Sequence, residues 1–332
     1  MLDNATQSVL DEIDKADLLV GNSLYKTVGT KNYFASVVDT NEGYIATAVD
    51  GVGSKIKHLM ARQMYDVIGK DCFAMCYNDL LCVGANPVGF SDHITSTQND
   101  SHIIPQVISG IAEYCKYSYT MLTGGETEIL QNTNFHISGS IMGTVQKNNL
   151  IDGSRVEPGD VIVGLPSSGI HANGWTAISQ RMPELIAPEY LDATKLYTRE
   201  IMTLMARIDN PCAIVNITGG GFRNLERIPK NVQYDLMFDY TPAPFQDLGC
   251  EFSHQELYTT FNMGIGMMVI VKMEDLAASL DAMENSRVIG GVVEAGNPRV
   301  VVNGQDIFFG DTVPYENDID EIVECNINLT DN

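Results

Sequence analysis

The first half of the chain carries patterns of apolar positions that predict strands mixed with helices. Residues 43–50 (GYIATAVD) and 136–145 (HISGSIMGTV) predict strands, and VGFSDHI after Pro87 predicts another. Residues 104–117 predict a helix. A further helix is predicted over 66–85, where apolar side chains recur at helical spacing: Val67, Ile68, Cys72, Met75, Cys76, Leu80 and Val83. This mixture indicates an α/β or α+β unit that ends near residue 150.

A turn signal at EPGD, residues 157–160, opens a second unit. VIVGLP predicts a short buried strand, SSGIHANG a polar loop, and WTAISQRM the start of a helix. AIVNITGGGFRNLERIP repeats the order of strand, glycine turn and helix start, and later elements are predicted over 263–271, 273–284 and 299–304. We therefore expect an α/β (α+β) fold of two domains, residues 1–156 and residues 157–332, with glycine turns at the ends of strands.

Length and hydropathy describe the class of protein. The chain has 332 residues, 44% of them hydrophobic, which is enough for a sizeable core and typical of about two domains. No run of residues approaches the roughly 18 to 20 apolar positions of a membrane helix. The N-terminal MLDNATQSVLDEIDKADLLV carries aspartates where a signal peptide carries lysines and an apolar run. We expect a soluble, cytoplasmic protein that does not bind membranes.

Cysteine spacing and charge exclude several kinds of site. Seven cysteines without a CxxC pair fit neither a disulfide framework nor a zinc ribbon, and we expect reduced thiols in or near the core. Cys72 and Cys76, four residues apart, could bind a metal, but two small buried side chains are the favoured interpretation. The net charge of −23 repels nucleic acids and anionic lipids. An enzyme this acidic that handles phosphates needs Mg²⁺ or backbone amides to offset the charge.

The turn DGVGSK, residues 50–55, matches neither common nucleotide-binding pattern. A Walker loop needs its lysine directly before the hydroxyl residue, whereas Ser54 precedes Lys55 here. A dinucleotide-binding turn needs a third glycine where Ile56 stands. The two glycines nevertheless let the backbone approach a ligand, with Asp50 before them and Lys55 after them. Asp50 is either a magnesium ligand or the cap of the next helix.

Two further carboxylates lie in settings that call for a partner. Asp79 sits on or beside the apolar face of the predicted helix 66–85, so it needs a cationic side chain or a metal to offset its burial. Glu126 follows LTGG directly, as Asp50 follows its own strand. For Asp79 alone a structural pairing is the favoured interpretation. The similar settings of Asp50 and Glu126 make a metal shared by these acids more plausible than any one of them would alone.

The loop SSGIHANG, residues 167–174, offers a histidine among small polar residues. His171 lies near Ser167, Ser168 and Asn173, just before a helix whose amides and dipole favour an anion. A single loop histidine is more often an ordinary surface residue. The flanking glycines and hydroxyl groups favour a role in binding.

Six ordered motifs resemble one family over roughly residues 10 to 310. They are VDGVGSKIKHLM, DVIGKDCFAMCYNDLLCVGANPVGFSDH, LTGGETE, IDGSRVEPGDVIVGLPSSGIHANGW, ITGGGFRNLERIP and TTFNMGIGM. The chain resembles the aminoimidazole ribonucleotide synthetases, or phosphoribosylformylglycinamidine cyclo-ligases, of purine biosynthesis. The resemblance implies an ATP-dependent ring closure of formylglycinamidine ribonucleotide that uses Mg²⁺ and commonly K⁺. It also implies a homodimer in which the N-terminal domains pair their sheets into a β-barrel.

The resemblance also implies roles for individual residues. Asp50 and Asp79 would bind Mg–ATP, and Glu126 would join them at the metal or the substrate. Asp79, Glu126 and His171 would be the catalytic group. The residues expected to contact the nucleotide, the substrate or the transferred phosphate are Gly51, Gly53, Ser54, Lys55, Asn173, Thr218, Gly219, Gly220 and Gly221. Positioning and charge neutralisation accelerate phosphoryl transfer, so no protein nucleophile is required.

The sequence departs from the family pattern at three places. The segment before the first sheet is short and holds only Gly29 where the family has a glycine-rich loop, and Lys26 or Lys31 is a candidate replacement. Asn216 stands where the family has a histidine, and Thr259 where it has an arginine. Two alternatives follow: a catalytically silent paralogue that binds nucleotide or a partner, and another ATP-using enzyme of the superfamily, such as a selenophosphate synthetase or a thiamine-phosphate kinase. The first cysteine, Cys72, lies too far along the chain for a selenophosphate synthetase.

Overall fold

The computed structural model describes residues 8–9, 12–13, 26–28, 33–238 and 242–307. All the strands of the described part of the chain lie within residues 24–308, which form one unit. The expectations about Gly29, Lys31 and Cys325 lie outside the described residues. No helix in the described part of the chain is both long enough and apolar enough to span a bilayer.

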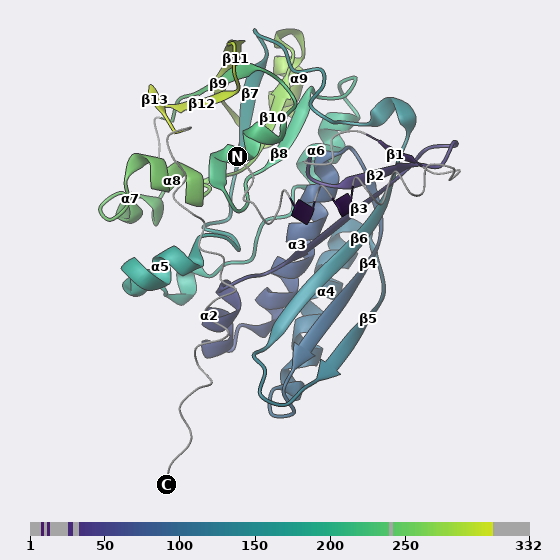
Figure 1. The fold of residues 1–332 in the computed structure, drawn as a ribbon, viewed down its shortest axis with the longest axis vertical. Coiled ribbons are helices and arrows are strands. Elements are labelled where there is room, and N and C mark those ends of the chain that lie inside the picture. The colour runs from purple at the N-terminus through teal and green to yellow at the C-terminus, as the bar shows by residue number, and fades with distance from the viewer. Residues whose placement is uncertain (1–7, 10–11, 14–25, 29–32, 239–241, 308–332) are drawn as a thin grey trace. The chain divides into compact units, whose positions relative to one another are not determined.

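The first sheet has six strands in the order β1-β2-β3-β6-β4-β5 (Figure 1). β4 and β5 run parallel, and the other neighbouring strands pair antiparallel. β5 is an edge strand whose residues are mostly exposed. The bounds are β1 Lys26–Val28, β2 Ser36–Asp39, β3 Tyr44–Gly51, β4 Asn86–Ser96, β5 Met121–Ile129 and β6 His136–Val145.

Two long helices cover one face of this sheet (Figure 1). α3 (Tyr65–Cys82) packs against β3, β6 and β4 and alongside α4 (Ile104–Ser118), and the short helix α2 (Lys55–Ala61) precedes α3. Fourteen of the 18 residues of α3 are buried, because the helix also packs against β8 (Ala213–Asn216) of the second sheet. A helix buried on nearly every side can bring polar side chains into the interior only where they have partners.

The second sheet has seven strands in the order β13-β12-β9-β11-β7-β10-β8. Only the pair β12 and β9 is parallel. All seven residues of β10 are buried, which explains its continuous apolar run IGMMVIV. The bounds of the remaining strands are β7 Val161–Pro166, β9 Val232–Leu236, β10 Ile265–Val271, β11 Arg287–Glu294, β12 Arg299–Val302 and β13 Gln305–Asp306.

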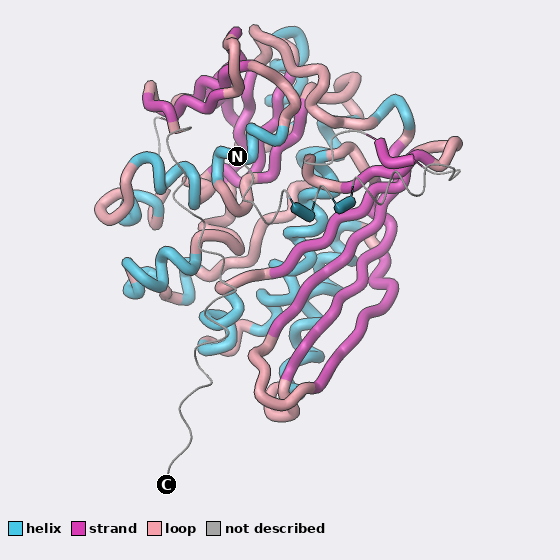
Figure 2. The backbone as a smooth tube through the Cα atoms, in the orientation of Figure 1, coloured by secondary structure: helices cyan, strands magenta, loops and turns pink. Residues whose placement is uncertain are grey.

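Short helices and loops complete this half (Figure 2). The helices are α5 Trp175–Arg181, α6 Thr198–Met205, α7 Phe245–Leu248, α8 His254–Thr260 and α9 Leu276–Ala282. The 3₁₀ helices of this half are Pro183–Leu185, Pro188–Tyr190, Gly221–Arg227 and Met273–Asp275. Two more 3₁₀ helices, Ser101–Ile103 and Lys147–Asn149, belong to the first half.

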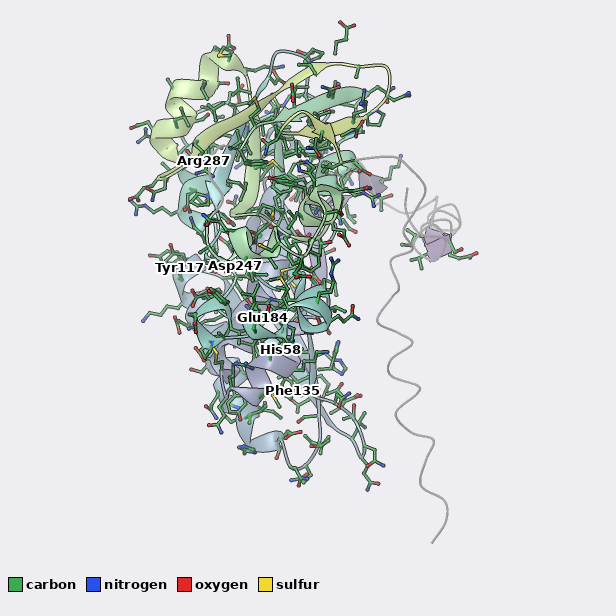
Figure 3. The ribbon with its side chains drawn as sticks, turned by 90° about the vertical axis from the view of Figure 1, so that its left-hand side faces the viewer. His58, Tyr117, Phe135, Glu184, Asp247 and Arg287 are labelled. Atoms are coloured by element: carbon green, nitrogen blue, oxygen red, sulfur yellow. The ribbon has the colours of Figure 1, made fainter. Side chains whose placement is uncertain are left out.

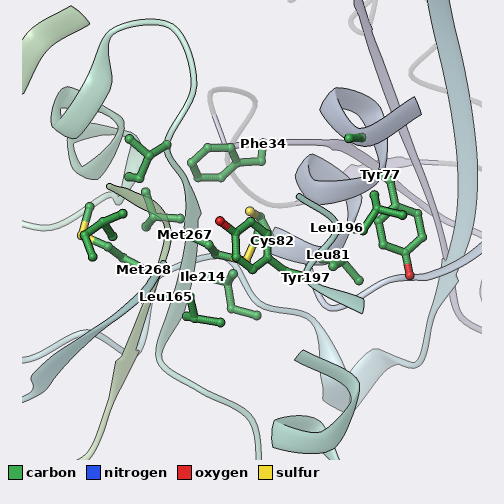
Figure 4. Packing of buried hydrophobic residues seen from close by; sticks show 14 of the residues in the cluster. Phe34, Tyr77, Leu81, Cys82, Leu165, Leu196, Tyr197, Ile214, Met267 and Met268 are labelled. Carbon is green, nitrogen blue, oxygen red and sulfur yellow. The ribbon is translucent and has the colours of Figure 1, made fainter. Parts of the chain in front are cut away.

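The two sheets share a hydrophobic core at the C-terminal end of α3. Figure 4 shows Cys82 of α3 among buried residues of the second half that include Ile214 and Met267. The Tyr33 hydroxyl donates to the Ile214 carbonyl oxygen at 2.8 Å and accepts from the Ile214 N–H at 3.2 Å. This core fixes the end of β8 against the helix that carries Asp79.

The mixed α/β architecture with two sheets confirms the expected fold class. The long elements predicted from periodicity are present, among them β3, α3, α4, β6, β7 and β10. The sequence analysis did not predict β9 or β11. β11 holds a glycine pair and a register shift between Val288 and Gly290, and β9 has only five residues. The domain limits 1–156 and 157–332 stay a prediction, as does the barrel, which involves a second chain.

Candidate active site

Two half-buried carboxylates meet where β3 ends beside α3. Asp50 lies at the end of β3 and accepts a hydrogen bond from the Gly51 N–H at 2.7 Å. Asp79 lies on α3 and accepts a hydrogen bond from Asn216 Nδ2, at the end of β8, at 2.8 Å. Burial, followed by the negative charge of Asp50, raises the pKa of Asp79 to about 7. Burial also raises the pKa of Asp50.

This pair suits a divalent cation. Among the described residues no Lys, Arg or His nitrogen lies within 4.0 Å of either carboxylate, so the predicted structural ion pair of Asp79 is absent there. Mg²⁺ typically takes one or two carboxylates together with phosphate oxygens. No group of three or more His, Cys, Asp or Glu side chains that could enclose a metal occurs in the described part of the chain. The two acids therefore offer an incomplete set of ligands, as a site for a metal–nucleotide complex requires.

The idea that Asp50 caps the next helix is wrong. The N-cap position of α2 belongs to Ser54, and Asp50 accepts from Gly51 instead. The Ser54 hydroxyl accepts a hydrogen bond from the Thr176 hydroxyl of α5 at 2.8 Å. The turn 51–54 therefore links Asp50 to the second half of the molecule.

Lys55 does not point into open space. Its side chain is fully buried, with Nζ 2.8 Å from Asp71 Oδ2 and 2.6 Å from the Asp192 carbonyl oxygen. In this structure its ammonium group balances a buried acid. The expected contact between Lys55 and phosphate is not supported by this geometry.

Glu126 lies far from the other two acids of the same chain. Gly51 of β3 pairs with Ser138 of β6, Ser138 pairs with His93 of β4, and His93 pairs with Glu126 of β5. Three strand spacings separate Glu126 from Gly51 by about 14 Å. Glu126 Oε1 accepts from the Thr127 N–H at the exposed sheet edge. One chain therefore cannot place Glu126 and Asp50 on one magnesium ion, and this part of the shared-metal hypothesis is corrected.

The glycine turn 218–221 lies directly after Asn216. Asn224 Nδ2 donates to the carbonyl oxygens of Gly219 at 3.1 Å and Gly221 at 2.7 Å, which holds the turn in shape. A methyl group on Gly219 would lie 3.4 Å from Asn173 Nδ2, so the loop 167–174 reaches this turn. The structure thus brings together Asn173 and the turn, and Asn216 connects the start of the turn to Asp79.

His171 is a buried acceptor rather than a surface residue. Its ring is 4% exposed, and Nε2 accepts from the Ser168 N–H at 3.2 Å and the Lys195 N–H at 3.5 Å. Burial lowers the pKa of His171 to about 3, with smaller contributions from the charges of Lys55 and Lys195. The imidazole is neutral at physiological pH, and these contacts order the loop 167–174.

The pKa of His171 predicts an acid-sensitive loop. A folded pKa below the ordinary 6.5 means that the unfolded chain binds more protons, so stability present above pH 6.5 falls as the pH falls. Between pH 6.5 and pH 5 we expect a loss of about 2 kcal/mol from this residue. Urea unfolding at both pH values should show this extra loss in the wild type but not in His171→Asn. The exposed His102→Asn should keep it, and an equal pH dependence in all three proteins would refute the assignment.

Asn262 is a loop anchor that the sequence analysis did not single out. Its Nδ2 donates to the carbonyl oxygens of Gly169 at 2.9 Å and Ile170 at 3.1 Å. Its Oδ1 accepts from the Ser167 hydroxyl at 3.2 Å and the Gly264 N–H at 2.9 Å. The motif TTFNMGIGM contains this residue, but only contacts across the fold reveal its role.

The remaining candidates have structural or surface positions. Lys26 is exposed in β1, and the Thr259 hydroxyl donates to the Gln255 carbonyl oxygen within α8. Cys76 Sγ donates to the Gly139 carbonyl oxygen at 3.3 Å, and both Cys72 and Cys76 are buried, which agrees with the interpretation as core thiols. Five cysteines are free and buried as expected, but Cys250 is exposed.

A cavity of about 530 Å³ lies away from the carboxylate pair, among residues of α4, α6 and α9. Ser168 and Lys195 line one side of it, and Tyr117, which is 55% exposed and labelled in Figure 3, lines another. Each basic residue that lines it is paired with an acid, for example Lys195 with Glu200 at 2.8 Å. The cavity therefore offers no unpaired cation to a phosphate.

Comparison with known proteins matches the two halves of the chain to two family models. Residues 34–145 match the family model "AIR synthase related protein, N-terminal domain", and residues 157–303 match "AIR synthase related protein, C-terminal domain". The chain belongs to the AIR synthase related protein family. The phosphoribosylformylglycinamidine cyclo-ligase of Alkaliphilus oremlandii is 34% identical over 288 residues, 78% of this chain and 84% of that protein. The cyclo-ligase of Lactococcus lactis subsp. lactis is 34% identical over 292 residues, 80% and 85% of the two chains.

Solved structures share the fold of this AIR synthase related protein. AaThiL complexed with AMPPCP and TMP superposes with a TM-score of 0.63 at 13% identity, covering 91% of this chain and 95% of that one. T. maritima PurL complexed with ADP gives a TM-score of 0.60 at 16% identity, covering 85% and 45%. At these identities the likeness concerns the fold alone.

Proposed function

We propose that this protein is a phosphoribosylformylglycinamidine cyclo-ligase of purine biosynthesis. The observation that carries the proposal is the 34% identity to a curated cyclo-ligase over 288 residues, which span 84% of that relative. The carboxylate pair Asp50 and Asp79 agrees with a reaction that uses a metal–nucleotide complex. Similarity to the ATP-using AaThiL is much lower, at 13% identity, so another enzyme of the superfamily is the weaker candidate.

The reaction closes the imidazole ring in two steps. The amide oxygen of formylglycinamidine ribonucleotide forms a bond to the terminal phosphorus of ATP, and ADP leaves. The amidine nitrogen then attacks the activated carbon, a C–N bond forms, and the oxygen leaves as phosphate. The products are aminoimidazole ribonucleotide, ADP and phosphate, with protons released to balance the charge.

The residues of the candidate active site have distinct roles in this proposal. Asp50 and Asp79 would hold Mg²⁺, which would neutralise phosphate charge and help to orient the terminal phosphate. The turns 51–54 and 218–221 bring backbone N–H groups close to the nucleotide and substrate. Asn216 keeps Asp79 oriented toward Asp50 through its 2.8 Å hydrogen bond. The loop 167–174 contributes Asn173, while His171 maintains the loop conformation. The K⁺ requirement, the part of Glu126 and the cytoplasmic location stay predictions from the sequence.

A coupled assay on the purified protein tests this function. We expect aminoimidazole ribonucleotide and ADP to appear together in equal amounts when Mg²⁺, K⁺, ATP and formylglycinamidine ribonucleotide are all present. Omitting the substrate should reduce ADP release to background. A folded protein that binds the substrate and ATP but forms no product would favour the catalytically silent paralogue.

The uncovered face of the first sheet supports a homodimer. Ile45, Val49, Val88 and Met142 are 37% to 72% exposed on the side opposite α3 and α4. A sheet face left to water normally carries polar side chains, so apolar ones indicate a partner. Among the described strands, β5 also has no neighbour along its outer edge. We propose that a second copy covers this face, as in the barrel implied by the family.

A single charge on this face should weaken the dimer. Val49 is 72% exposed on this face, so Val49→Lys would bury an ammonium group in the proposed interface. We expect its dimer dissociation constant to rise by at least about 30-fold, as measured by analytical ultracentrifugation. Val293→Lys, at a 40% exposed position on β11, is the matched control and should leave the mass unchanged. Equal dimerisation of both variants would contradict the proposed interface.

A further inference from the structure

Residues 192–197 form a connection without regular secondary structure that runs over α3. Thr194, Leu196 and Tyr197 are buried, so water does not solvate much of this backbone. Buried N–H and carbonyl groups outside helices and sheets need partners from elsewhere. Here the partners are mostly side chains of the first half, so the position of this connection depends on that half.

Three buried side chains supply most of these bonds, and we call them the clamp: Lys55, Asp71 and Asn78. Lys55 Nζ donates to the Asp192 carbonyl oxygen at 2.6 Å, and Asp71 Oδ1 accepts from the Thr194 N–H at 2.7 Å. Asn78 Nδ2 donates to the Lys195 carbonyl oxygen at 2.9 Å, and its Oδ1 accepts from the Tyr197 N–H at 3.4 Å. All three clamp side chains are 0% exposed.

The clamp is built on one face of α3. Asp71 and Asn78 are seven residues apart, nearly two turns, so both side chains point toward segment 192–197. Lys55 Nζ lies 2.8 Å from Asp71 Oδ2, so the two buried groups form an ion pair. A buried ion pair is poor evidence of added stability, because desolvation offsets much of the attraction. The arrangement is better suited to holding a geometry.

On its other side, segment 192–197 is hydrogen-bonded to the loop 167–174. The Ser168 hydroxyl donates to the Ala193 carbonyl oxygen at 2.7 Å, and the Lys195 N–H donates to His171 Nε2 at 3.5 Å. The Tyr197 hydroxyl donates to the Pro166 carbonyl oxygen at 3.1 Å, just before the loop begins. Segment 192–197 therefore lies between α3 and the loop 167–174 and bonds to both.

We propose that Lys55, Asp71 and Asn78 are positioning residues that set the loop 167–174 relative to Asp79. Asp79 directly follows Asn78 on α3, so one helix carries both the candidate metal ligand and the clamp. Segment 192–197 transmits the position of that helix to the loop, and Lys55 acts through Asp71 and Asp192 without touching phosphate. The kinetic part of this inference rests on the proposed cyclo-ligase function, whereas the contacts themselves do not.

The variant Asn78→Ala removes two clamp bonds and should loosen the loop. Thr194→Val is the matched control, because the buried Thr194 hydroxyl has no partner in the described structure and its N–H to Asp71 is kept. We expect amides of residues 165–175 and 190–198 to exchange hydrogen at least about 10-fold faster in Asn78→Ala than in Thr194→Val. Trp175, the only tryptophan, donates to the His171 carbonyl oxygen at 2.7 Å, so its fluorescence should also change.

Ser168→Ala tests the same connection from the exposed loop side, where misfolding is not a concern. It should speed exchange in residues 190–198, and Ser168→Thr should restore the wild-type rate. In the cyclo-ligase assay we expect Asn78→Ala and Ser168→Ala to raise the KM for formylglycinamidine ribonucleotide by about 10-fold or more. The Kd for Mg–ATP should stay within about threefold of wild type.

The double variant Lys55→Met with Asp71→Leu separates positioning from phosphate contact. Both changes keep an apolar side chain of similar size and leave no unpaired charge. We expect unchanged Mg–ATP affinity and faster exchange of the loop. A Kd for Mg–ATP raised more than about 10-fold would overturn the assignment of Lys55, and wild-type exchange in Asn78→Ala and Ser168→Ala would overturn the clamp. If the wild type makes no product, the proposed function fails, while hydrogen exchange and Trp175 fluorescence still decide the clamp.

Discussion

The Asp79→Asn variant is expected to lose about 10²–10³-fold in kcat/KM for ring closure. Asn keeps the oxygen that accepts from Asn216 Nδ2 and retains the shape of the side chain, so the change removes mainly the negative charge. Without it, Asp50 alone remains to bind Mg²⁺ at this position. Steady-state assays at saturating Mg²⁺ measure the loss.

The same variant should be more stable than the wild type when metal is absent. Burial raises the pKa of Asp79 to about 7, so the folded state binds more protons than the unfolded state between pH 4 and pH 7. The free energy of unfolding therefore falls as the pH rises through this range, and the penalty is complete above pH 7. At pH 8 in EDTA we expect Asp79→Asn to gain about 4 kcal/mol, measured by urea unfolding.

Asp66→Asn is the matched control on the same helix. Asp66 is half exposed and pairs with Lys70 at 3.0 Å on the surface of α3, so its replacement should change activity less than about twofold. Activity of Asp79→Asn within tenfold of the wild type would show that Asp79 is not a metal ligand. A loss of activity together with a loss of metal-free stability would indicate a structural part for Asp79.

Gly221→Ala is expected to be among the most damaging single-methyl changes in the candidate site. Gly221 has a φ of +55°, and an added Cβ would lie 2.3 Å from the Tyr258 carbonyl oxygen. Because a backbone atom cannot rotate away, the turn 218–221 or α8 must shift. We expect a loss of about 2 to 4 kcal/mol in the free energy of unfolding and at least about tenfold in kcat/KM.

Gly220→Ala provides an internal comparison. Gly220 also has a positive φ, +87°, but no atom lies within 4 Å of an added Cβ. Its cost should be limited to about 1 kcal/mol for the left-handed backbone. Equal destabilisation of the two variants in urea unfolding would mean that the clash with Tyr258 is relieved without consequence.

Local patterns were sufficient for the long elements and for two of the glycine turns, but the turn expected at LTGG before Glu126 is wrong, because residues 121–129 form the continuous strand β5. The spacing of apolar residues over 66–85 predicted α3, and the alternation over 136–145 predicted β6, because a buried face imposes its period on the sequence. Glycines after strands likewise marked the turns 51–53 and 218–221. β9 and β11 escaped prediction because an interrupted or short apolar run has no distinctive period.

The roles of residues that depend on contacts between distant parts of the chain could not be predicted from the sequence. Lys55 was predicted to contact phosphate because it follows a glycine turn. The packing of α2 against α3 instead places Lys55 beside Asp71, and the two side chains form an ion pair. Glu126 resembles Asp50 in its local setting, but the strand order β3-β6-β4-β5 separates them. Strand order is set by which faces and edges bury best together, and no local pattern encodes it.

By itself the sequence determined the fold class, the glycine turns and the family resemblance, since these depend on periodicity and on ordered motifs. The tertiary structure decided which polar groups meet: Asp79 with Asn216, Asp71 with Lys55, and His171 with Lys195. The physical reason is that a buried polar group must find a partner within hydrogen-bonding distance. Among these three pairs the longest separation along the chain is the 137 residues between Asp79 and Asn216.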